Sequence, residues 1–267
     1  KAVVEKSRRQ LANALNSKPE EIIFTSSGSE SNNMVLKGVL NPGDHFITSS
    51  YEHPAILKVL PFLESKNIST TIVNPDKNGL ILPSDIEENI NANTRLISIM
   101  WVNNELGTIN PISEIGSIAR NRNILFHSDA VQALGKIYIN VDETPVDFLS
   151  MSAHKLYGPK GIGALYKRRG SKLEPLIHGG GQEYSLRAST ENIGGIAGFG
   201  MAAELSTSKL EENTNHILRL ESYFLNLLNE QNISYTINGT KRIPGVFNIT
   251  FHGVNGQDLV LQLDFLG

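Results

Sequence analysis

Hydrophobic and polar positions change their spacing at regular intervals along the chain, and the spacing predicts alternating strands and helices. Short, mostly apolar runs predict strands at 21–25, 45–48, 70–73, 95–101, 124–127 and 146–149. Apolar residues at helical spacing predict helices at 3–15, 29–40 and 111–120, with shorter helices opening near 52–54 and 84–87. Several strand runs are apolar throughout, which is typical of a mostly parallel sheet covered by helices on both faces. The sequence therefore predicts an α/β fold through at least residue 166.

The pattern changes after Tyr166. A loop is expected at 177–192, followed by a long helical stretch at 193–229 that breaks near Thr207. Two further strands, at 233–237 and 246–251, and a helix starting at 257–263 complete the chain. We expect a large domain at 1–200 and a small α+β domain at 201–267 that is incomplete at Gly267.

Two of the predicted helices begin with capping signals. Ser29 is expected as the N-cap of the helix at 29–40, because a serine hydroxyl accepts a hydrogen bond from an N–H of the first turn. Ser84 and Glu87 have the spacing of a capping box at the start of a short helix.

Polar residues with useful chemistry follow several strands at the point where each strand ends. In open α/β sheets, ligands bind at the carboxyl ends of the strands. We therefore expect a site at one edge of the sheet, formed by Ser29, His53, Asn104, Asp129 and Lys155.

Composition and charge argue against several classes of function. The chain has 267 residues and a formal net charge of −3 with no long basic run, so no nucleic-acid partner is expected. The hydrophobic fraction of 40% and charged fraction of 19% suit a globular protein, and no apolar run reaches the length of a membrane span. The absence of cysteine excludes disulfides and thiolate ligands, and no metal site is expected.

Lys155 is the most unusual of the strand-end residues. It follows the apolar strand at 146–149 and is flanked by polar turn residues. Burial favours the neutral form of a lysine, and a neutral amine can form a Schiff base with an aldehyde. The alternative is an ordinary solvated loop lysine.

The neighbouring strand ends supply what a planar, anionic aldehyde cofactor needs. Gly28 and Ser29 at a helix start offer N–H groups and a hydroxyl to a phosphate. Asp129 offers a carboxylate, Gln132 a donor one turn further on, and His53 a flat imidazole. With a lysine, this set matches what pyridoxal phosphate requires. Taken singly, Asp129 and His53 are more often capping residues, so spacing alone indicates only an α/β enzyme with a strand-end site.

Three motifs in order resemble cysteine desulfurases of the NifS/IscS type, which are pyridoxal-phosphate-dependent members of the class V aminotransferase family. They are Ala153 to Gly161 (AHKLYGPKG), Val102 to Gly107 (VNNELG) and His178 to Glu183 (HGGGQE). The resemblance runs from about Ala12 to the chain end. It implies a fold-type I large domain, a homodimer, L-cysteine as substrate, and sulfur transfer to an acceptor protein, either an iron–sulfur scaffold or a tRNA-thiolation enzyme, in the cytoplasm.

The resemblance also assigns roles around the cofactor ring. Lys155 matches the Schiff-base lysine, and His53 matches the histidine that stacks on the ring and takes part in proton transfer. Asp129 matches the partner of the ring nitrogen, and Gln132 matches the donor to the ring oxygen. Asn104 lies at the position near the cofactor oxygen and the substrate.

A second group matches the family's phosphate ligands. Gly28 supplies backbone, while Ser29, Ser152 and His154 supply side chains; Ser29 stands where many relatives have threonine, which also carries a hydroxyl. Thr190 matches a residue that reaches the phosphate of the partner subunit.

The chain departs from the family in lacking the cysteine that carries the persulfide. The family's substrate-carboxylate arginine and N-terminal segment are also unmatched. We therefore expect a form truncated at both ends and inactive by itself. Two alternatives stay open: another class V enzyme, such as a selenocysteine lyase or an aminotransferase, and a non-catalytic scaffold that binds the cofactor or dimerises.

Overall fold

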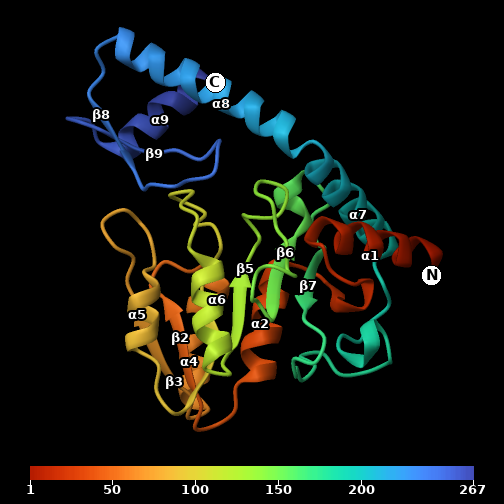
Figure 1. Cartoon of the computed structure of the whole chain (residues 1–267). Coiled ribbons are helices and arrows are strands. Elements are labelled where there is room, and N and C mark those ends of the chain that lie inside the picture. The colour runs from red at the N-terminus through yellow and green to blue at the C-terminus, as the bar shows by residue number, and fades with distance from the viewer.

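A computed structural model describes residues 1–267, which form a large mixed sheet, a set of helices around it and a small two-stranded sheet (Figure 1). The strands are β1 (Ile22–Thr25), β2 (His45–Ser49), β3 (Ser69–Val73), β4 (Thr94–Ser98), β5 (Leu125–Asp129), β6 (Phe148–Ser152), β7 (Gly163–Lys167), β8 (Tyr235–Asn238) and β9 (Asn248–Phe251). The α-helices are α1 (Ala2–Leu15), α2 (Gly28–Val39), α3 (Pro54–Leu57), α4 (Leu60–Ser65), α5 (Pro83–Glu88), α6 (Ile112–Asn121), α7 (Ile193–Ser208), α8 (Leu210–Glu230) and α9 (Gly256–Leu266).

The large sheet has seven strands in the order β1-β7-β6-β5-β4-β2-β3. Strands β3, β2, β4, β5 and β6 pair in parallel, whereas β7 runs antiparallel to both of its neighbours. The predicted mostly parallel sheet is thus confirmed. The carboxyl ends of the parallel strands lie at one edge, which is where the sequence places its polar residues.

Two apolar clusters cover the two faces of the sheet. Ile22, Ile47, Ile97 and Leu149 belong to the cluster that contains residues of α1, α6 and α7. The neighbouring positions Ile23, Phe46, Leu96 and Phe148 belong to the cluster that contains Met34, Val35 and Leu36 of α2. Successive residues in a strand point to opposite faces. Strands buried on both faces therefore need continuous apolar runs, which is the pattern in the sequence.

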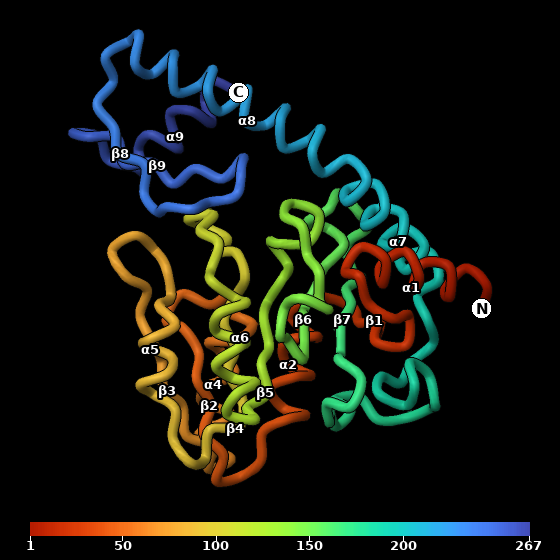
Figure 2. Tube along the Cα trace, viewed as in Figure 1, coloured from red at the N-terminus to blue at the C-terminus, as the bar shows by residue number.

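Helix α1 packs beside α7 (Figure 2). Arg8 of α1 binds both carboxylate oxygens of Glu183, with Nη1 2.7 Å from Oε2 and Nη2 2.8 Å from Oε1. Nη1 of Arg8 also donates to the Ile22 carbonyl, and the Phe24 N–H donates to Glu183. One buried ion pair therefore joins α1, β1 and the loop before α7.

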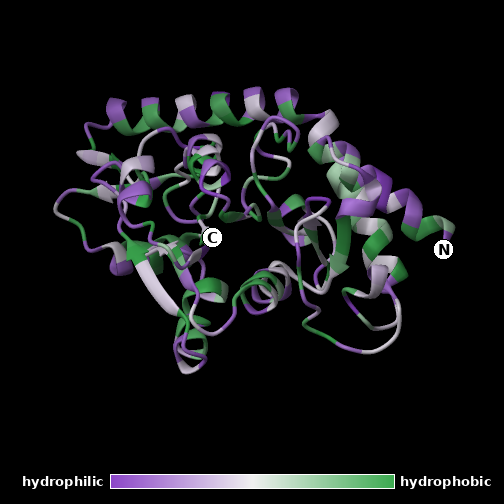
Figure 3. Cartoon of the chain, turned by 60° about the horizontal axis from the view of Figure 1, so that its bottom comes forward, coloured by the Kyte–Doolittle hydropathy of each residue, from purple (hydrophilic) through white to green (hydrophobic).

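The helical stretch after residue 193 breaks at Lys209, close to the expected break near Thr207. Helix α8 leads to a small part made of β8, β9 and α9 (Figure 1). Hydrophilic and hydrophobic residues alternate along α8 (Figure 3). The division at 200 and 201 falls within α7, and the existence of two separate domains stays a prediction. None of the helices combines the length and the apolar character needed to cross a membrane.

Both expected capping signals are wrong in detail. Ser27, rather than Ser29, is the N-cap of α2, and its hydroxyl accepts from the Glu30 N–H at 3.1 Å. Helix α5 begins at Pro83 after Leu82 and has no side-chain cap, because the proline ring already fixes the backbone of the first turn. Because Ser27 caps α2, the Ser29 hydroxyl is not used as the helix cap.

The Arg8–Glu183 pair should contribute strongly to stability. Both side chains are at most 5% exposed, so Arg8→Ala leaves a buried, unpaired carboxylate. We expect Arg8→Ala to lower the free energy of unfolding by about 3–5 kcal/mol, measured by urea denaturation. The matched control is Arg122→Ala, which removes the exposed pair with Glu87 and should cost less than about 1 kcal/mol. Equal losses in the two variants would contradict this prediction.

Candidate active site

The end of β5 meets the start of α2 at the carboxyl edge of the sheet. A Cβ atom on Gly28 would lie 2.6 Å from Cγ2 of Val131 and 3.7 Å from Cβ of Ser152. Only glycine therefore fits at the start of this helix. Because the first turn of a helix has N–H groups without intrahelical acceptors, this contact places anion-binding groups beside the ends of β5 and β6.

Asp129 is the buried acid of this edge. It is 5% exposed, and its Oδ2 accepts from Nδ2 of Asn32 at 2.7 Å. Its Oδ1 accepts from the Val131 N–H at 3.0 Å. Burial raises the pKa of Asp129, although the two hydrogen bonds and the nearby His53 act to lower it.

A second buried carboxyl group, Glu52, lies close to Asp129. Its Oε1 accepts from the Ser49 hydroxyl at 2.7 Å and the Met100 N–H at 2.8 Å, while its Oε2 is buried without a partner. Burial raises the pKa of Glu52 to about 8, and the charge of Asp129 adds to the rise. At neutral pH, Glu52 is therefore mostly uncharged.

His53 lies at the N-terminus of α3 and is exposed. Its Nδ1 accepts from the Ala55 N–H at 3.0 Å, so the ring caps the helix. The ring is also near enough to Asp129 to act on the pKa of that carboxyl group. The ring thus combines a structural cap with a position beside the buried acid.

Lys155 is exposed, contrary to the expected burial. It lies in the 3-10 turn Ala153–Leu156 that follows β6, and it lines a cleft of about 850 Å³ between that turn, α7 and α8. The turn carries the lysine beyond the end of the strand, which is why the apolar strand does not bury it. In the same cleft, burial and the charge of Lys155 lower the pKa of Lys136 to about 8, and Lys136 donates to Oε1 of Gln132.

The candidate phosphate ligands lie on both sides of Gly28. The Ser152 hydroxyl is 2.8 Å from Nδ1 of His154, so these two side chains form a pair at the end of β6. Ser29 is exposed, next to Gly28 in the first turn of α2. The structure therefore brings together Gly28, Ser29, Ser152 and His154, as expected from the sequence.

Asn104 and Thr190 are less closely connected to this group. Asn104 is exposed in the turn after β4. The same segment is held beside the end of β5, because the Trp101 N–H donates to the Asp129 carbonyl at 3.0 Å. Thr190 is exposed and lines a separate cavity of about 180 Å³ that also includes Thr25, Ser26 and Arg187. Within this single chain, Thr190 is not placed against Ser29 or His154 by any contact.

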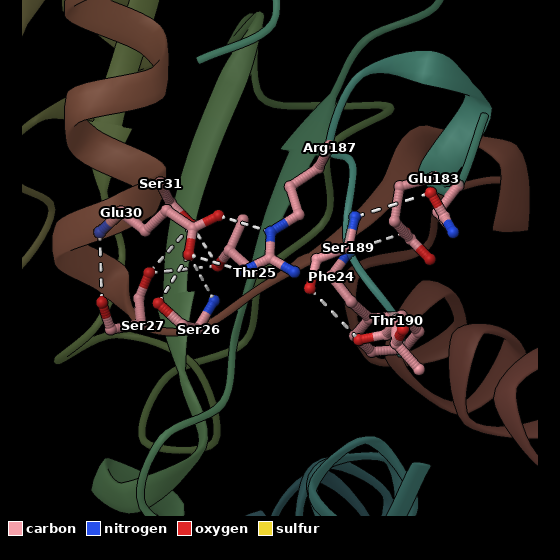
Figure 4. Close-up of polar contacts among 11 residues, drawn as sticks. Phe24, Thr25, Ser26, Ser27, Glu30, Ser31, Glu183, Arg187, Ser189 and Thr190 are labelled. Atoms are coloured by element: carbon pink, nitrogen blue, oxygen red, sulfur yellow. Dashed lines mark hydrogen bonds and ion pairs between the residues drawn. The ribbon is translucent and has the colours of Figure 1, made fainter. Parts of the chain in front are cut away.

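An ion pair connects the Thr190 loop to the start of α2 (Figure 4). Nε of Arg187 donates to Oε1 of Glu30 at 2.8 Å, and the Ser26 N–H donates to Oε2 of Glu30 at 2.8 Å. Burial acts to raise the pKa of Glu30, but the hydrogen bonds from Arg187 and Ser26 outweigh it and hold that pKa below its usual value. Glu30 is therefore ionised, and the Arg187 guanidinium balances its charge beside the anion-binding turn.

Comparisons with known proteins establish the family of the chain. The family model described as aminotransferase class-V matches residues 1–266. The chain is 45% identical to the cysteine desulfurase IscS of Dictyoglomus turgidum, with 100% of this chain and 69% of that protein covered. It is also 45% identical to the mitochondrial cysteine desulfurase of Saccharomyces cerevisiae, covering 97% of this chain and 54% of that protein. The chain belongs to the cysteine desulfurases of the class V aminotransferase family.

Solved structures show the same relationship. A NifS-like protein superposes with a TM-score of 0.94 at 36% identity, covering 100% of this chain and 74% of that one. SspA, solved in complex with cysteine, superposes with a TM-score of 0.86 at 40% identity, covering 100% and 75% of the two chains. Members of this family depend on pyridoxal 5′-phosphate, which confirms the expected cofactor class.

The residues present fit this cofactor. The Gly28 turn leaves no room for a Cβ and offers N–H groups for a phosphate, while Ser152 and His154 add polar side chains. Asp129 offers a buried carboxylate to a protonated ring nitrogen, and Lys155 offers an accessible amine. The donor set therefore matches each chemically distinct part of the cofactor.

Two buried residues of the site escaped the sequence-based prediction. Asn32 follows Gly28 by four residues on one helix, and that spacing places it on the same face. Glu52 immediately precedes His53 at a strand end. The helical spacing of Asn32 and the position of Glu52 can both be read from the sequence. Neither an asparagine nor a glutamate is distinctive enough at such a position to indicate a site.

The pKa of Glu52 predicts a pH-dependent contribution to stability. Its pKa is about 8 in the folded chain and near 4.5 when unfolded, so the folded state binds the proton more tightly. This contribution is complete below pH 4.5 and is lost as the pH rises to 8. Glu52→Gln removes the titration but keeps an oxygen that can accept from Ser49 and Met100. As the pH rises from 4.5 to 8, the free energy of unfolding of the variant should increase relative to that of the natural chain. The expected increase is up to about 1.4 kcal/mol per pH unit. A constant difference in thermal stability from pH 5 to pH 8 would contradict the assignment.

Proposed function

We propose that these residues serve a pyridoxal-phosphate-dependent conversion of L-cysteine to L-alanine, with the sulfur passing to a thiol as a persulfide. The Cβ–S bond of cysteine breaks, an S–S bond forms to the accepting thiol, and a proton goes to Cβ to give alanine. The observation that best supports this assignment is the buried Asp129 carboxylate beside the Gly28 turn, in a chain that belongs to the cysteine desulfurases.

Each residue has a defined task in this proposal. The cofactor, when bound, supplies an electron sink for the substrate carbon next to its amino group. Asp129 holds the proton on the ring nitrogen, Gln132 donates to the ring oxygen, and His53 lies against the ring and moves a proton. Lys155 holds the cofactor aldehyde, and Asn104 contacts the substrate side of the ring.

The phosphate is held by the Gly28 N–H together with Ser29, Ser152 and His154. A charged phosphate at a helix N-terminus is stabilised by the N–H groups and the helix dipole. We also propose a homodimer in which Thr190 reaches the phosphate of the partner subunit. The ion pair between Arg187 and Glu30 supports this arrangement, because it fixes the loop that carries Thr190.

The thiol that accepts sulfur lies outside these 267 residues, since they include no cysteine. From that thiol, we propose that sulfur passes to an acceptor protein of iron–sulfur assembly or tRNA thiolation. A cytoplasmic location is part of the proposal, whereas two of the relatives are named as mitochondrial.

The assignment of Lys155 can be tested by chemical attachment. We expect purified chain incubated with pyridoxal phosphate to turn yellow, and borohydride reduction to attach the cofactor to the peptide that contains Lys155. The measurement is mass spectrometry of the digested protein. Lys155→Ala should abolish attachment, while the exposed Lys160 provides a matched control through Lys160→Ala. Attachment at Lys160 in the natural chain would refute the assignment.

The chain by itself should release no alanine from L-cysteine above background, even with the cofactor bound. Persulfide formation needs a thiolate nucleophile, and the chain contains none. The measurement is alanine and sulfide release, with the complete Dictyoglomus relative as positive control and the same reductant in both samples. Turnover within tenfold of that control would show that the reaction needs no enzyme thiol.

A further inference from the structure

Asn32 is a buried amide in contact with Asp129 and has no role in the site described so far. It is 1% exposed, and its Nδ2 lies 2.7 Å from Oδ2 of Asp129. From this geometry we infer that Asn32 is a positioning residue, whose amide holds the Asp129 carboxylate in the orientation that keeps the cofactor's ring nitrogen protonated. This inference rests on the proposed function of Asp129.

The chemistry of the two groups determines the direction of the amide. A carboxylate only accepts hydrogen bonds, so the NH₂ end of Asn32 must face Asp129. Its Oδ1 is then left buried without a partner. A buried acceptor without a partner costs free energy, and the charge-assisted bond to Asp129 must offset that cost. Asn32 is therefore oriented for Asp129 at the expense of its own second hydrogen bond.

Two other ionisable side chains, Glu52 and His53, lie near the Asp129 carboxylate. Glu52 is buried close by and is mostly uncharged at neutral pH, since burial raises its pKa to about 8. The exposed His53 ring lies near the Asp129 carboxylate and acts to lower its pKa. The remaining contact to the Asp129 carboxylate comes from the Val131 N–H, which is backbone and cannot be changed by substitution. Asn32 is therefore the side chain through which the orientation of Asp129 can be altered.

Helix α2 also couples Asn32 to the phosphate end of the site. Gly28 and Asn32 are four residues apart and lie on one helix face, Gly28 against Val131 and Ser152 and Asn32 against Asp129. A single rigid element thus presents N–H groups to the phosphate and an amide to the acid. Asparagine is a weak helix former. Its contact with Asp129 gives a reason for its presence in the middle of α2.

The test compares two ligands in the natural chain and in Asn32→Leu. The ligands are pyridoxal phosphate and its deaza analogue, in which carbon replaces the ring nitrogen. We expect Asn32→Leu to weaken binding of pyridoxal phosphate about tenfold, because it removes a hydrogen bond to a charged group. Binding of the deaza analogue should change less than twofold. The ¹⁵N resonance of labelled cofactor should also move toward that of unprotonated pyridine.

The controls separate this inference from the proposed function. Asn33→Ala removes a neighbouring amide that contacts the carbonyls of Ser29 and Ala55, and it should leave the ¹⁵N resonance unchanged. Asn32→Ala, with a smaller side chain, replaces Asn32→Leu if the latter does not fold. Equal weakening, or loss of binding, for both ligands in Asn32→Ala would assign Asn32 a purely structural role and overturn the inference. If the natural chain itself binds the two ligands equally and shows an unprotonated ring nitrogen, the role of Asp129 fails instead.

Discussion

A single buried carboxylate constrains the architecture of the candidate site. Removing an ion from water costs several kcal/mol unless partners compensate for the loss of hydration. For Asp129 the partners are an amide from α2 and a backbone N–H from the chain just after β5. Burial also raises the pKa of the nearby Glu52 to about 8, and Asp129 adds to the rise. Helix α2 and the end of β5 thus both supply partners to one buried carboxyl group.

The cleft that Lys155 lines has a basic character. Lys136, Lys155 and Lys209 line the cleft beside α7 and α8, and the lowered pKa of Lys136 reflects both burial and a neighbouring amine. These lysine side chains favour an anionic ligand in this cleft.

Much of the fold could be predicted from the sequence because burial on both faces leaves continuous apolar runs, as in β2, β4 and β6. The convergence of Gly28, Ser152 and Asp129 followed from the rule that strand ends share an edge. The exposure of Lys155 could not be predicted, since it depends on a short 3-10 turn that no helical or strand periodicity indicates. The N-cap at Ser27 was missed because several serines in a row satisfy the same local rule. Long-range pairs such as Arg8 with Glu183 leave no trace in local spacing.

The position of β1 in the sheet has a consequence for biosynthesis. Ile22 to Thr25 pair with the residues from Tyr166 back to Gly163, and no other strand adjoins β1. Helix α1 likewise awaits Glu183 and α7. The side chains of β1 can meet those of α1 and α2 early, because these elements are close in sequence. During translation, which adds about 5–20 residues per second, the backbone of β1 waits many seconds for its strand partner β7.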